Sequence, residues 1–366
     1  MATIERCRQL FQVSRIANSK SVLEVFDRCL PVLIKSCIYE DRTESEIKEL
    51  RHTGLFDRFE RVLDYNVSSG KKIRGLLVVE AYRSFVKPYP SSNDFMRSIV
   101  LGWCLEFLQA SFLVADDIMD NSKTRRGQPC WYTIEDIGLS AFNDAFFLES
   151  TVYTLLDLYM GDHPSYSALV KLFHDGTRRT INGQEMDLMV SKPSSDCRTF
   201  NMSTYSAIVK WKTAFYTLLL PVHLGLTLSR AQLAKEVVEE MDELLMHLGI
   251  YFQVQDDYLD VFGEPSVTGK VGTDIQDNKC AWPIVRAMEL ATPSQREHLY
   301  ANYGKPDIEN VRQVKRIFYE LRIQDEYAQF EENSAQRTRA LITSLPKGAP
   351  KRLFINLANR LFKRAK

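Results

Sequence analysis

Two short segments of the chain each carry three aspartates at the same spacing. Residues four apart on a helix lie on one face, so the outer aspartates of each triplet share a face and the middle one lies about 100° away from its neighbour. Buried carboxylates are tolerated only when they are paired or bind a metal ion. Two triplets in apolar surroundings therefore favour a metal site over solvated helix turns. The six residues are Asp116, Asp117, Asp120, Asp256, Asp257 and Asp260.

Carboxylate oxygens are ligands for hard cations, so these triplets predict Mg²⁺ or Mn²⁺. Mg²⁺ usually takes one or two carboxylates and leaves its other positions to water and substrate phosphates. Two triplets could thus hold a small metal cluster that grips a polyphosphate.

Three groups of basic residues could bind such a polyphosphate. Lys71 and Arg74 precede an apolar helix pattern, and the amides of a helix N-terminus bind anions. Arg125 and Arg126 follow the first triplet, and guanidinium groups chelate phosphate. Lys212 lies in an otherwise apolar stretch, where a lysine either reaches solvent or holds a phosphate.

The composition narrows the class of protein. The 366 residues carry 47 basic and 47 acidic side chains, so the overall charge gives no indication of nucleic-acid binding. Seven scattered cysteines without a CxxC pair suggest reduced thiols in an intracellular protein. We find no apolar run of transmembrane length and expect no stable membrane insertion.

Helical periodicity runs through most of the chain, and no stretch clearly alternates like a strand. We therefore predict an all-α protein, with residues 21–366 as a single domain. The tail, residues 351–366, reads as a basic amphipathic helix that either binds a membrane surface or covers an anionic site. Residues 1–20 are rich in arginine and fit a transit peptide or a solvated helix equally, so we predict a cytoplasmic or mitochondrial protein.

From about residue 50 onward the chain resembles the trans-isoprenyl diphosphate synthase family, most closely its eukaryotic farnesyl diphosphate synthases of the insect or fungal kind. The segments that carry the resemblance are GKKIRG (70–75), LQASFLVADDIMDNSKTRRGQPCWY (108–132), GQEMDL (183–188), KWKTAFY (210–216) and FQVQDDYLDVFGEPSVTGKVGTDIQDNKCAW (252–282). This resemblance implies a bundle of long helices around a deep central cavity, the isoprenoid synthase type I fold, usually as a homodimer. It also implies that both aspartate motifs hold three Mg²⁺ on an allylic prenyl diphosphate.

The resemblance implies a role for each residue that matches a family motif. The six aspartates correspond to metal ligands, directly or through water. The allylic diphosphate would be bound by Arg125, Lys212 and Lys270. Isopentenyl diphosphate would be bound by Lys71, Arg74, Gln109, Arg126 and Arg364. Gln253 and Lys279 match further diphosphate and metal-network contacts, and Lys212, Thr213 and Gln253 would lie near the developing carbocation. Catalysis would depend most on Lys212, Thr213, Gln253, Asp116 and Asp256.

Four positions depart from the family pattern: Ser69, Ile73, Ser111 and Glu185. Ser69 replaces a glycine, and Ile73 replaces an asparagine of the isopentenyl diphosphate site. Ser111 and Phe112 stand where the family has an aromatic pair at the floor of the chain-length pocket, so Ser111 would deepen it.

Three functions are consistent with these residues. The first is prenyl transfer to isopentenyl diphosphate, which makes geranyl or farnesyl diphosphate. The second is a terpene synthase that releases diphosphate from farnesyl diphosphate and uses no isopentenyl diphosphate. The third is a non-catalytic subunit of a prenyltransferase, against which the intact aspartate motifs argue.

Overall fold

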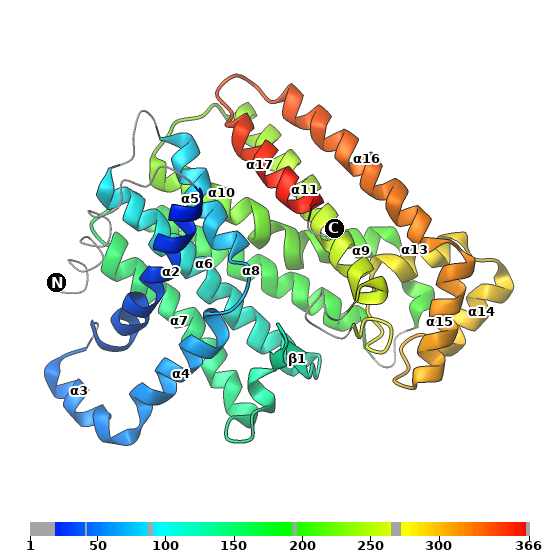
Figure 1. Ribbon diagram of the computed structural model, residues 1–366, viewed down its shortest axis with the longest axis horizontal. Helices are drawn as coiled ribbons and strands as arrows, with labels where there is room; N and C mark the ends of the chain where they lie inside the picture. Colours follow the sequence, from blue (N-terminus) through cyan, green and yellow to red (C-terminus); the bar gives the residue numbers. More distant parts are fainter. Residues whose placement is uncertain (1–18, 41, 87–90, 193–195, 265–271, 364–366) are drawn as a thin grey trace. The chain divides into compact units, whose positions relative to one another are not determined.

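The computed structural model describes residues 19–40, 42–86, 91–192, 196–264 and 272–363. It confirms the all-α prediction, because the regular secondary structure of the described residues is helical apart from one two-stranded hairpin (Figure 1). The chain divides into two compact units. Unit 1 comprises Met1–His174 and Leu220–Gln232, and unit 2 comprises Asp175–Leu219 and Leu233–Lys366. The single-domain organisation stays a prediction.

Unit 1 is built around helix α6 (Ser92–Met119), on which α2, α4, α5, α7 and α10 pack. Its other elements, in chain order, are α2 (Ser19–Lys35), η1 (Ser36–Glu40), α3 (Glu44–Leu50), η2 (Arg51–Thr53), α4 (Leu55–Val67), α5 (Ile73–Phe85), β1 (Thr124–Arg125), β2 (Gln128–Pro129), η3 (Trp131–Thr133), η4 (Gly138–Ser140), α7 (Ala141–Met160), the start of α8 (Tyr166–Val190) and α10 (Leu220–Ser229).

Helix α6 is apolar on nearly every side, as a helix at the centre of a bundle must be. In the described part of the chain it is the one helix that is long and apolar enough to cross a membrane, because an 18-residue window within Asn93–Met119 reaches a mean hydropathy of 1.7. The prediction that no apolar run reaches this length was therefore wrong. Glu106 and Gln109 interrupt the apolar residues, but the mean hydropathy of the segment remains high. Within the protein, 83% of the window is buried, as in the core helix of a globular unit.

Helices α5 and α6 approach closely because glycines face each other. A Cβ atom on Gly102 would lie 2.5 Å from the carbonyl oxygen of Gly75. Beside this contact, the Phe26 and Trp103 rings stack at 4.4 Å, and Trp103 Nε1 donates to the Phe26 carbonyl at 2.8 Å. This close packing fixes the start of α5, and with it the basic segment before it, against α6.

Unit 2 is built around helix α11 (Lys235–Phe262), which packs against the π-helix η6 (Lys210–Leu219) and against α9, α13 and α16. Its other elements are the remainder of α8, η5 (Cys197–Thr199), α9 (Met202–Val209), α13 (Trp282–Leu290), α14 (Pro293–Asn302), α15 (Ile308–Glu320), α16 (Ile323–Ser344) and α17 (Lys351–Phe362). An apolar cluster that includes Val254, Ile284 and Phe318 fills its core.

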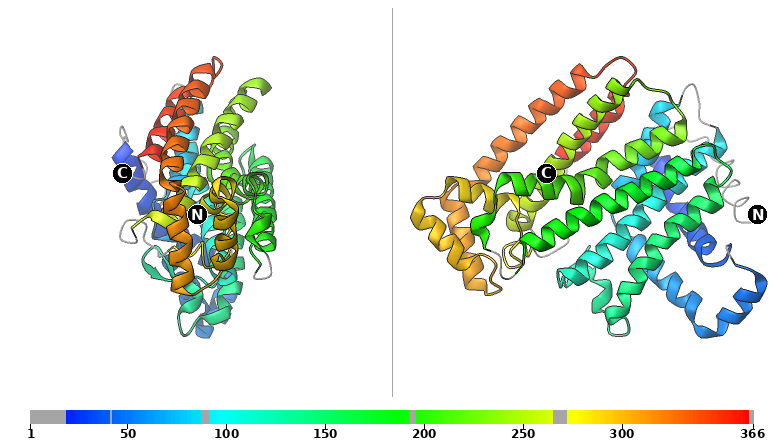
Figure 2. Two further views of the ribbon diagram at one scale, coloured as in Figure 1. Left: turned by 90° about the vertical axis from the view of Figure 1, so that its right-hand side faces the viewer. Right: turned by 180° about the vertical axis from the view of Figure 1, so that it is seen from behind.

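The C-terminal helix α17 is amphipathic, as predicted, and lies beside α16 (Figure 2). Its apolar residues Leu353, Phe354 and Leu357 are buried. At its end, the Phe362 ring packs on Tyr251 at 4.3 Å. Because this face is already covered, it is not available to a membrane surface, one of the two alternatives for the tail.

Replacing Gly102 with alanine should destabilise the protein. The new methyl group would overlap the α5 backbone, and overpacking of this kind costs about 1–3 kcal/mol. We expect the free energy of unfolding in urea to fall by that amount, despite the higher helix propensity of alanine. An unchanged free energy of unfolding would mean that α5 and α6 separate at little cost and that their close approach does not fix the basic segment.

Candidate active site

The first aspartate triplet lies at the C-terminal end of α6, in unit 1. Asp116 and Asp120 are half-buried, whereas Asp117 is buried. Asp117 Oδ1 accepts hydrogen bonds from Arg125 Nε at 3.0 Å and Nη2 at 2.5 Å. Burial raises the pKa of Asp117, and the charge and hydrogen bonds of Arg125 act against this shift. Arg125 therefore holds Asp117, the middle aspartate. Asp116 and Asp120 lie one turn apart on a neighbouring face of the helix.

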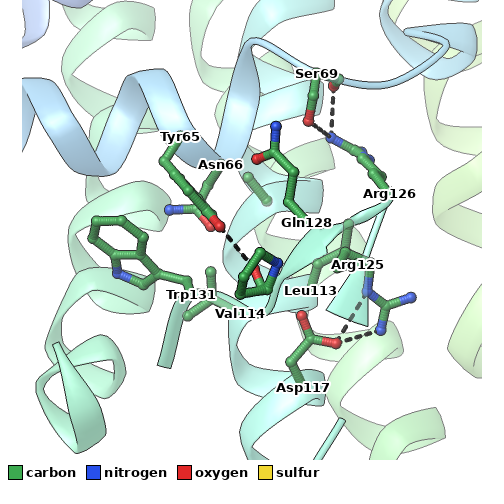
Figure 3. A pocket seen from close by; sticks show the side chains of 12 residues that line it. Tyr65, Asn66, Ser69, Leu113, Val114, Asp117, Arg125, Arg126, Gln128 and Trp131 are labelled. Atoms are coloured by element: carbon green, nitrogen blue, oxygen red, sulfur yellow. Dashed lines mark hydrogen bonds and ion pairs between the residues drawn. The ribbon is translucent and has the colours of Figure 1, made fainter. Parts of the chain in front are cut away.

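The two arginines after this triplet are carried by the β1–β2 hairpin (Figure 3). Arg126 and Gly127 both have positive φ, 55° and 76°, as a two-residue type I′ turn requires. Arg125 reaches back to Asp117 and, at 3.4 Å, to Asp116. Arg126 points the other way. Its Nη1 donates to the Ser69 carbonyl at 2.6 Å and contacts Ser69 Oγ at 3.3 Å.

The segment that receives Arg126 is the predicted anion loop before α5. Gly70 leaves room for the guanidinium, because a Cβ atom there would lie 2.7 Å from Arg126 Cζ. Lys71 is exposed and Arg74 half-buried. Glu106 on α6 accepts the backbone N–H of Gly75 at 2.8 Å, and burial raises its pKa against the opposing effect of that bond and of nearby Arg74 and Arg126. Unit 1 therefore brings Arg125, Arg126 and the basic segment together beside the first triplet.

The other predicted residues of unit 1 lie on α6 before the triplet. Gln109 and Ser111 are buried and Phe112 is half-buried. The cavity drawn in Figure 3 lies nearby but has a volume of about 30 Å³, room for roughly one water. It is not a substrate pocket, and the chain-length role of Ser111 and Phe112 stays a prediction.

The second triplet lies near the C-terminal end of α11, in unit 2, and repeats the pattern of the first. Asp257 is buried and accepts hydrogen bonds from Gln253 Nε2 at 2.7 Å and from the Trp282 backbone N–H at 2.9 Å. Burial raises its pKa, against the effect of these two bonds. Asp256 and Asp260 are half-buried, and Asp260 Oδ2 accepts the Asp274 N–H at 3.0 Å.

A buried ion-pair cluster in unit 2 joins two of the predicted lysines. Asp187 of α8 accepts Lys212 Nζ at 2.6 Å and Lys279 Nζ at 3.1 Å, both at Oδ2. Burial alone raises the pKa of Asp187, but the charges and hydrogen bonds of the two lysines outweigh it and hold the pKa below its usual range. Lys212 lies in η6, next to the buried Thr213. π-helical turns are frequent at functional sites.

Asp187 received no role in the sequence analysis. A lysine inside an apolar stretch needs a carboxylate partner. The position of Lys212 in such a stretch could therefore have prompted a search for an acidic residue such as Asp187. Asp187 and Lys212 can meet because of Gly183, which lies one helical turn before Asp187. A Cβ atom on Gly183 would lie 2.1 Å from the Lys212 backbone nitrogen, so α8 and η6 touch at this point.

Three predictions fall on residues outside the described part of the chain. They are the diphosphate contacts of Lys270 and Arg364 and the nature of residues 1–20, of which 1–18 are not described. These assignments and the predicted compartment stay predictions.

The chain is similar to known proteins over most of its length. The polyprenyl synthetase family matches residues 56–321. A farnesyl pyrophosphate synthase of Mus musculus is 44% identical over 324 residues, which are 87% of this chain and 92% of the relative. One of Gallus gallus is 44% identical over 331 residues, 90% of each chain, and one of Schizosaccharomyces pombe is 40% identical over 347 residues, 93% of this chain and 97% of the relative. The chain belongs to the polyprenyl synthetase family.

Substituting asparagine for Asp187 should destabilise the protein in a pH-dependent way. Removing one partner of a buried ion pair costs about 3–5 kcal/mol, and we expect about 2–4 kcal/mol here because the lysines are partly exposed. A carboxylate with a depressed pKa contributes stability above its unfolded pKa of about 3.9 and loses it as the pH falls through its folded pKa. Urea unfolding should therefore show the largest difference from the wild type above about pH 5, narrowing below about pH 4.

A matched control is Glu239→Gln, which removes a carboxylate from an exposed pair with Lys235 in the same unit. It should change the free energy of unfolding by less than about 1 kcal/mol. A difference for Asp187→Asn that stayed constant down to pH 3 would contradict the assignment of the effect to carboxylate charge.

Proposed function

We propose that this chain is a prenyltransferase that joins an allylic prenyl diphosphate head to tail to isopentenyl diphosphate, making geranyl and farnesyl diphosphate. The observation that carries the proposal is the conjunction of Arg125, Arg126 and the Gly70 segment beside the first triplet, in a chain 44% identical to a farnesyl pyrophosphate synthase. Two arginines that point in different directions can bind two separate diphosphates. Arg125 would serve the allylic substrate, and Arg126 with Lys71 and Arg74 the isopentenyl substrate.

We propose that the outer aspartates of each triplet hold Mg²⁺, with Mn²⁺ as a possible substitute and three ions as the expected number. Their donor set fits, since half-buried carboxylates one turn apart suit a hard cation that also takes water and phosphate oxygens. When bound, Mg²⁺ supplies positive charge to the departing diphosphate.

The side chains of the protein do the remaining work. Arg125 and Lys212 stabilise negative charge as the allylic C–O bond breaks. Both are paired with carboxylates in this structure, so an incoming diphosphate competes with Asp117 for Arg125 and with Asp187 for Lys212. The carbocation is then attacked by the double bond of isopentenyl diphosphate, and the departed diphosphate takes the proton. Thr213 and Gln253 would border the cation, and apolar neighbours would keep water away from it.

We also propose that the chain is a homodimer. Unit 1 exposes Leu139, Phe142 and Phe146 at 75%, 58% and 58%, and the two phenyl rings meet edge to face at 5.1 Å. Large apolar side chains grouped on one exposed helix face are typical of a protein interface.

A terpene synthase is the alternative that specific residues favour. Ile73 offers no hydrogen bond at the start of α5, and Ser69 contacts the guanidinium of Arg126. Both changes alter the proposed isopentenyl diphosphate site. The similarity to farnesyl pyrophosphate synthases over most of both chains favours prenyl transfer.

A product assay tests the proposal. The purified chain with Mg²⁺ should convert geranyl diphosphate plus isopentenyl diphosphate into farnesyl diphosphate, and farnesyl diphosphate alone should yield no volatile product.

Chelation of the metal should abolish turnover, and Asp116→Ala or Asp256→Ala should lower it by about 10³-fold or more, the scale of losing a transition-state charge contact. Asp162→Ala, at an exposed carboxylate, is the control. A terpene from farnesyl diphosphate without elongation would establish the alternative instead.

A further inference from the structure

A second cavity of unit 1 lies at the opposite end of α6 from the first aspartate triplet. Its volume is about 490 Å³, and pockets that bind small ligands span about 300–1,000 Å³. Its lining comes from the end of α5, the start of α6, the connection between α7 and α8, and the end of α10. Asp94, which lines it, lies about 33 Å along α6 from Asp116, because a helix rises by about 1.5 Å per residue. The cavity is therefore separate from the proposed site of prenyl transfer.

His163 contributes a hydrogen-bond donor to this cavity. The residue is 7% exposed, and its Nδ1 accepts the backbone N–H of Ser165 at 3.1 Å. A ring nitrogen that accepts carries no hydrogen, so the hydrogen of the neutral imidazole is on Nε2. Asp94 Oδ1 lies 3.9 Å from Nε2, which is beyond hydrogen-bond distance. Nε2 thus has no hydrogen-bond partner within the described residues, and its N–H suits an oxygen acceptor rather than a metal ion.

The environment of His163 favours this neutral form. Burial lowers its pKa, and the charges of Arg97 and Arg230 lower it further, against the opposing effects of Asp94 and Asp162. A protonated imidazole would also bring a second hydrogen to Nδ1, which already accepts a backbone N–H. Nε2 is therefore a donor at neutral pH without any charge on the ring.

Two further donors line the cavity. Tyr82 is 2% exposed, and its hydroxyl has no hydrogen-bond partner among the residues that the structure describes. Burial raises the pKa of Tyr82, as does the nearby Asp94, against the effect of Arg97, so the hydroxyl keeps its proton. Arg230 directly follows α10, is exposed, and has no ion-pair partner in the described part of the chain. One arginine and two buried uncharged donors therefore border the same space.

Arg97 and Asp94 also line the cavity, but each is held by other groups of the protein. Arg97 Nη1 lies 3.0 Å from Asp94 Oδ1, and Nη2 lies 2.5 Å from Asp162, which is exposed. The second oxygen of Asp94 accepts the Ser91 hydroxyl at 3.0 Å. Arg97 and Asp94 balance each other, which leaves Arg230 as the remaining charge of the described lining.

We propose that this cavity binds a small oxyanion, a phosphate or a carboxylate, through His163 Nε2, the Tyr82 hydroxyl and Arg230. Donors without a partner suit a ligand that presents acceptor oxygens, and the guanidinium adds a charge-assisted hydrogen bond. Val86 and Leu228 line the same cavity and would contact an apolar part of the ligand. Binding here is independent of the proposed prenyl transfer, since none of these residues belongs to the proposed metal or diphosphate sites.

The test is calorimetric titration of the purified full chain with inorganic phosphate and, separately, with butyrate, at constant ionic strength and with a metal chelator present. Tyr82→Phe removes one hydroxyl. His163→Asn removes Nε2 and leaves an oxygen that can accept the Ser165 N–H. We expect each of these variants, and Arg230→Gln, to weaken binding of the tighter anion by about tenfold, the scale of one lost hydrogen bond that involves a charged group. The tighter anion identifies the ligand chemistry as phosphate or carboxylate.

Two arginine variants serve as controls. Arg83→Gln removes an exposed arginine of α5 that is not part of the described lining, and it should change the affinity by less than about twofold because solvent screens its charge. Arg126→Gln removes a candidate diphosphate ligand, so anion binding that this variant alone weakens belongs to the prenyl transfer site. Undiminished binding in Arg230→Gln, or binding of neither anion to the wild type, would overturn the proposal.

Nitrogen-15 NMR of the six histidine side chains gives a readout that anion binding at the prenyl transfer site does not produce. His163, assigned through His163→Asn, should show the tautomer protonated at Nε2, and its Nε2 signal should shift when the protein is saturated with the tighter anion. Protonation at Nδ1, or an unchanged Nε2 signal when the anion is bound, would contradict the assignment of this cavity.

Discussion

A carboxylate placed on a buried helix must find a positive partner or a hydrogen-bond donor within reach, and this requirement shapes both units of the protein. Asp117 takes Arg125, Asp257 takes the Trp282 amide and Gln253, and Asp187 takes two lysines. Each pairing fastens a segment of irregular backbone or a neighbouring element to a long helix. The hairpin is tied to α6 in this way, and the start of α13 is tied to α11.

Close backbone approaches decide which side chains can meet. Gly183 lets α8 touch η6, and only then does the side chain of Asp187, one turn later, reach Lys212. Gly102 and Gly75 do the same for α6 and α5, which sets the basic segment beside the first triplet. Within each unit, side chains far apart in the sequence converge because small residues allow the helices carrying them to pack closely.

The fold class could be predicted from the sequence, because apolar residues at helical spacing report helices directly. The sequence also pointed to Arg125, Arg126 and Lys212, and the family resemblance to Lys279, but their roles stay predictions. It did not distinguish the middle aspartates from the outer ones. On a helical wheel Asp117 and Asp257 lie only at the edge of their face, and each accepts a hydrogen bond from outside its helix, from Arg125 of the hairpin or from the Trp282 amide. Nor did the sequence reveal Asp187, since it acquires its meaning from partners on other elements. The hairpin was missed because two-residue strands leave no periodicity to read.

We propose a division within each triplet: the outer aspartates bind metal, and groups of the protein hold the middle aspartate most closely. The most direct test is titration of Mn²⁺ into the wild type, Asp116→Asn and Asp117→Asn in the presence of inorganic pyrophosphate, followed by electron paramagnetic resonance. We predict that Asp116→Asn weakens Mn²⁺ binding by about tenfold or more, the scale of losing one charged ligand contact, while Asp117→Asn changes it by less than about threefold. An equal loss of affinity in Asp117→Asn would contradict the division and return all three aspartates to the metal.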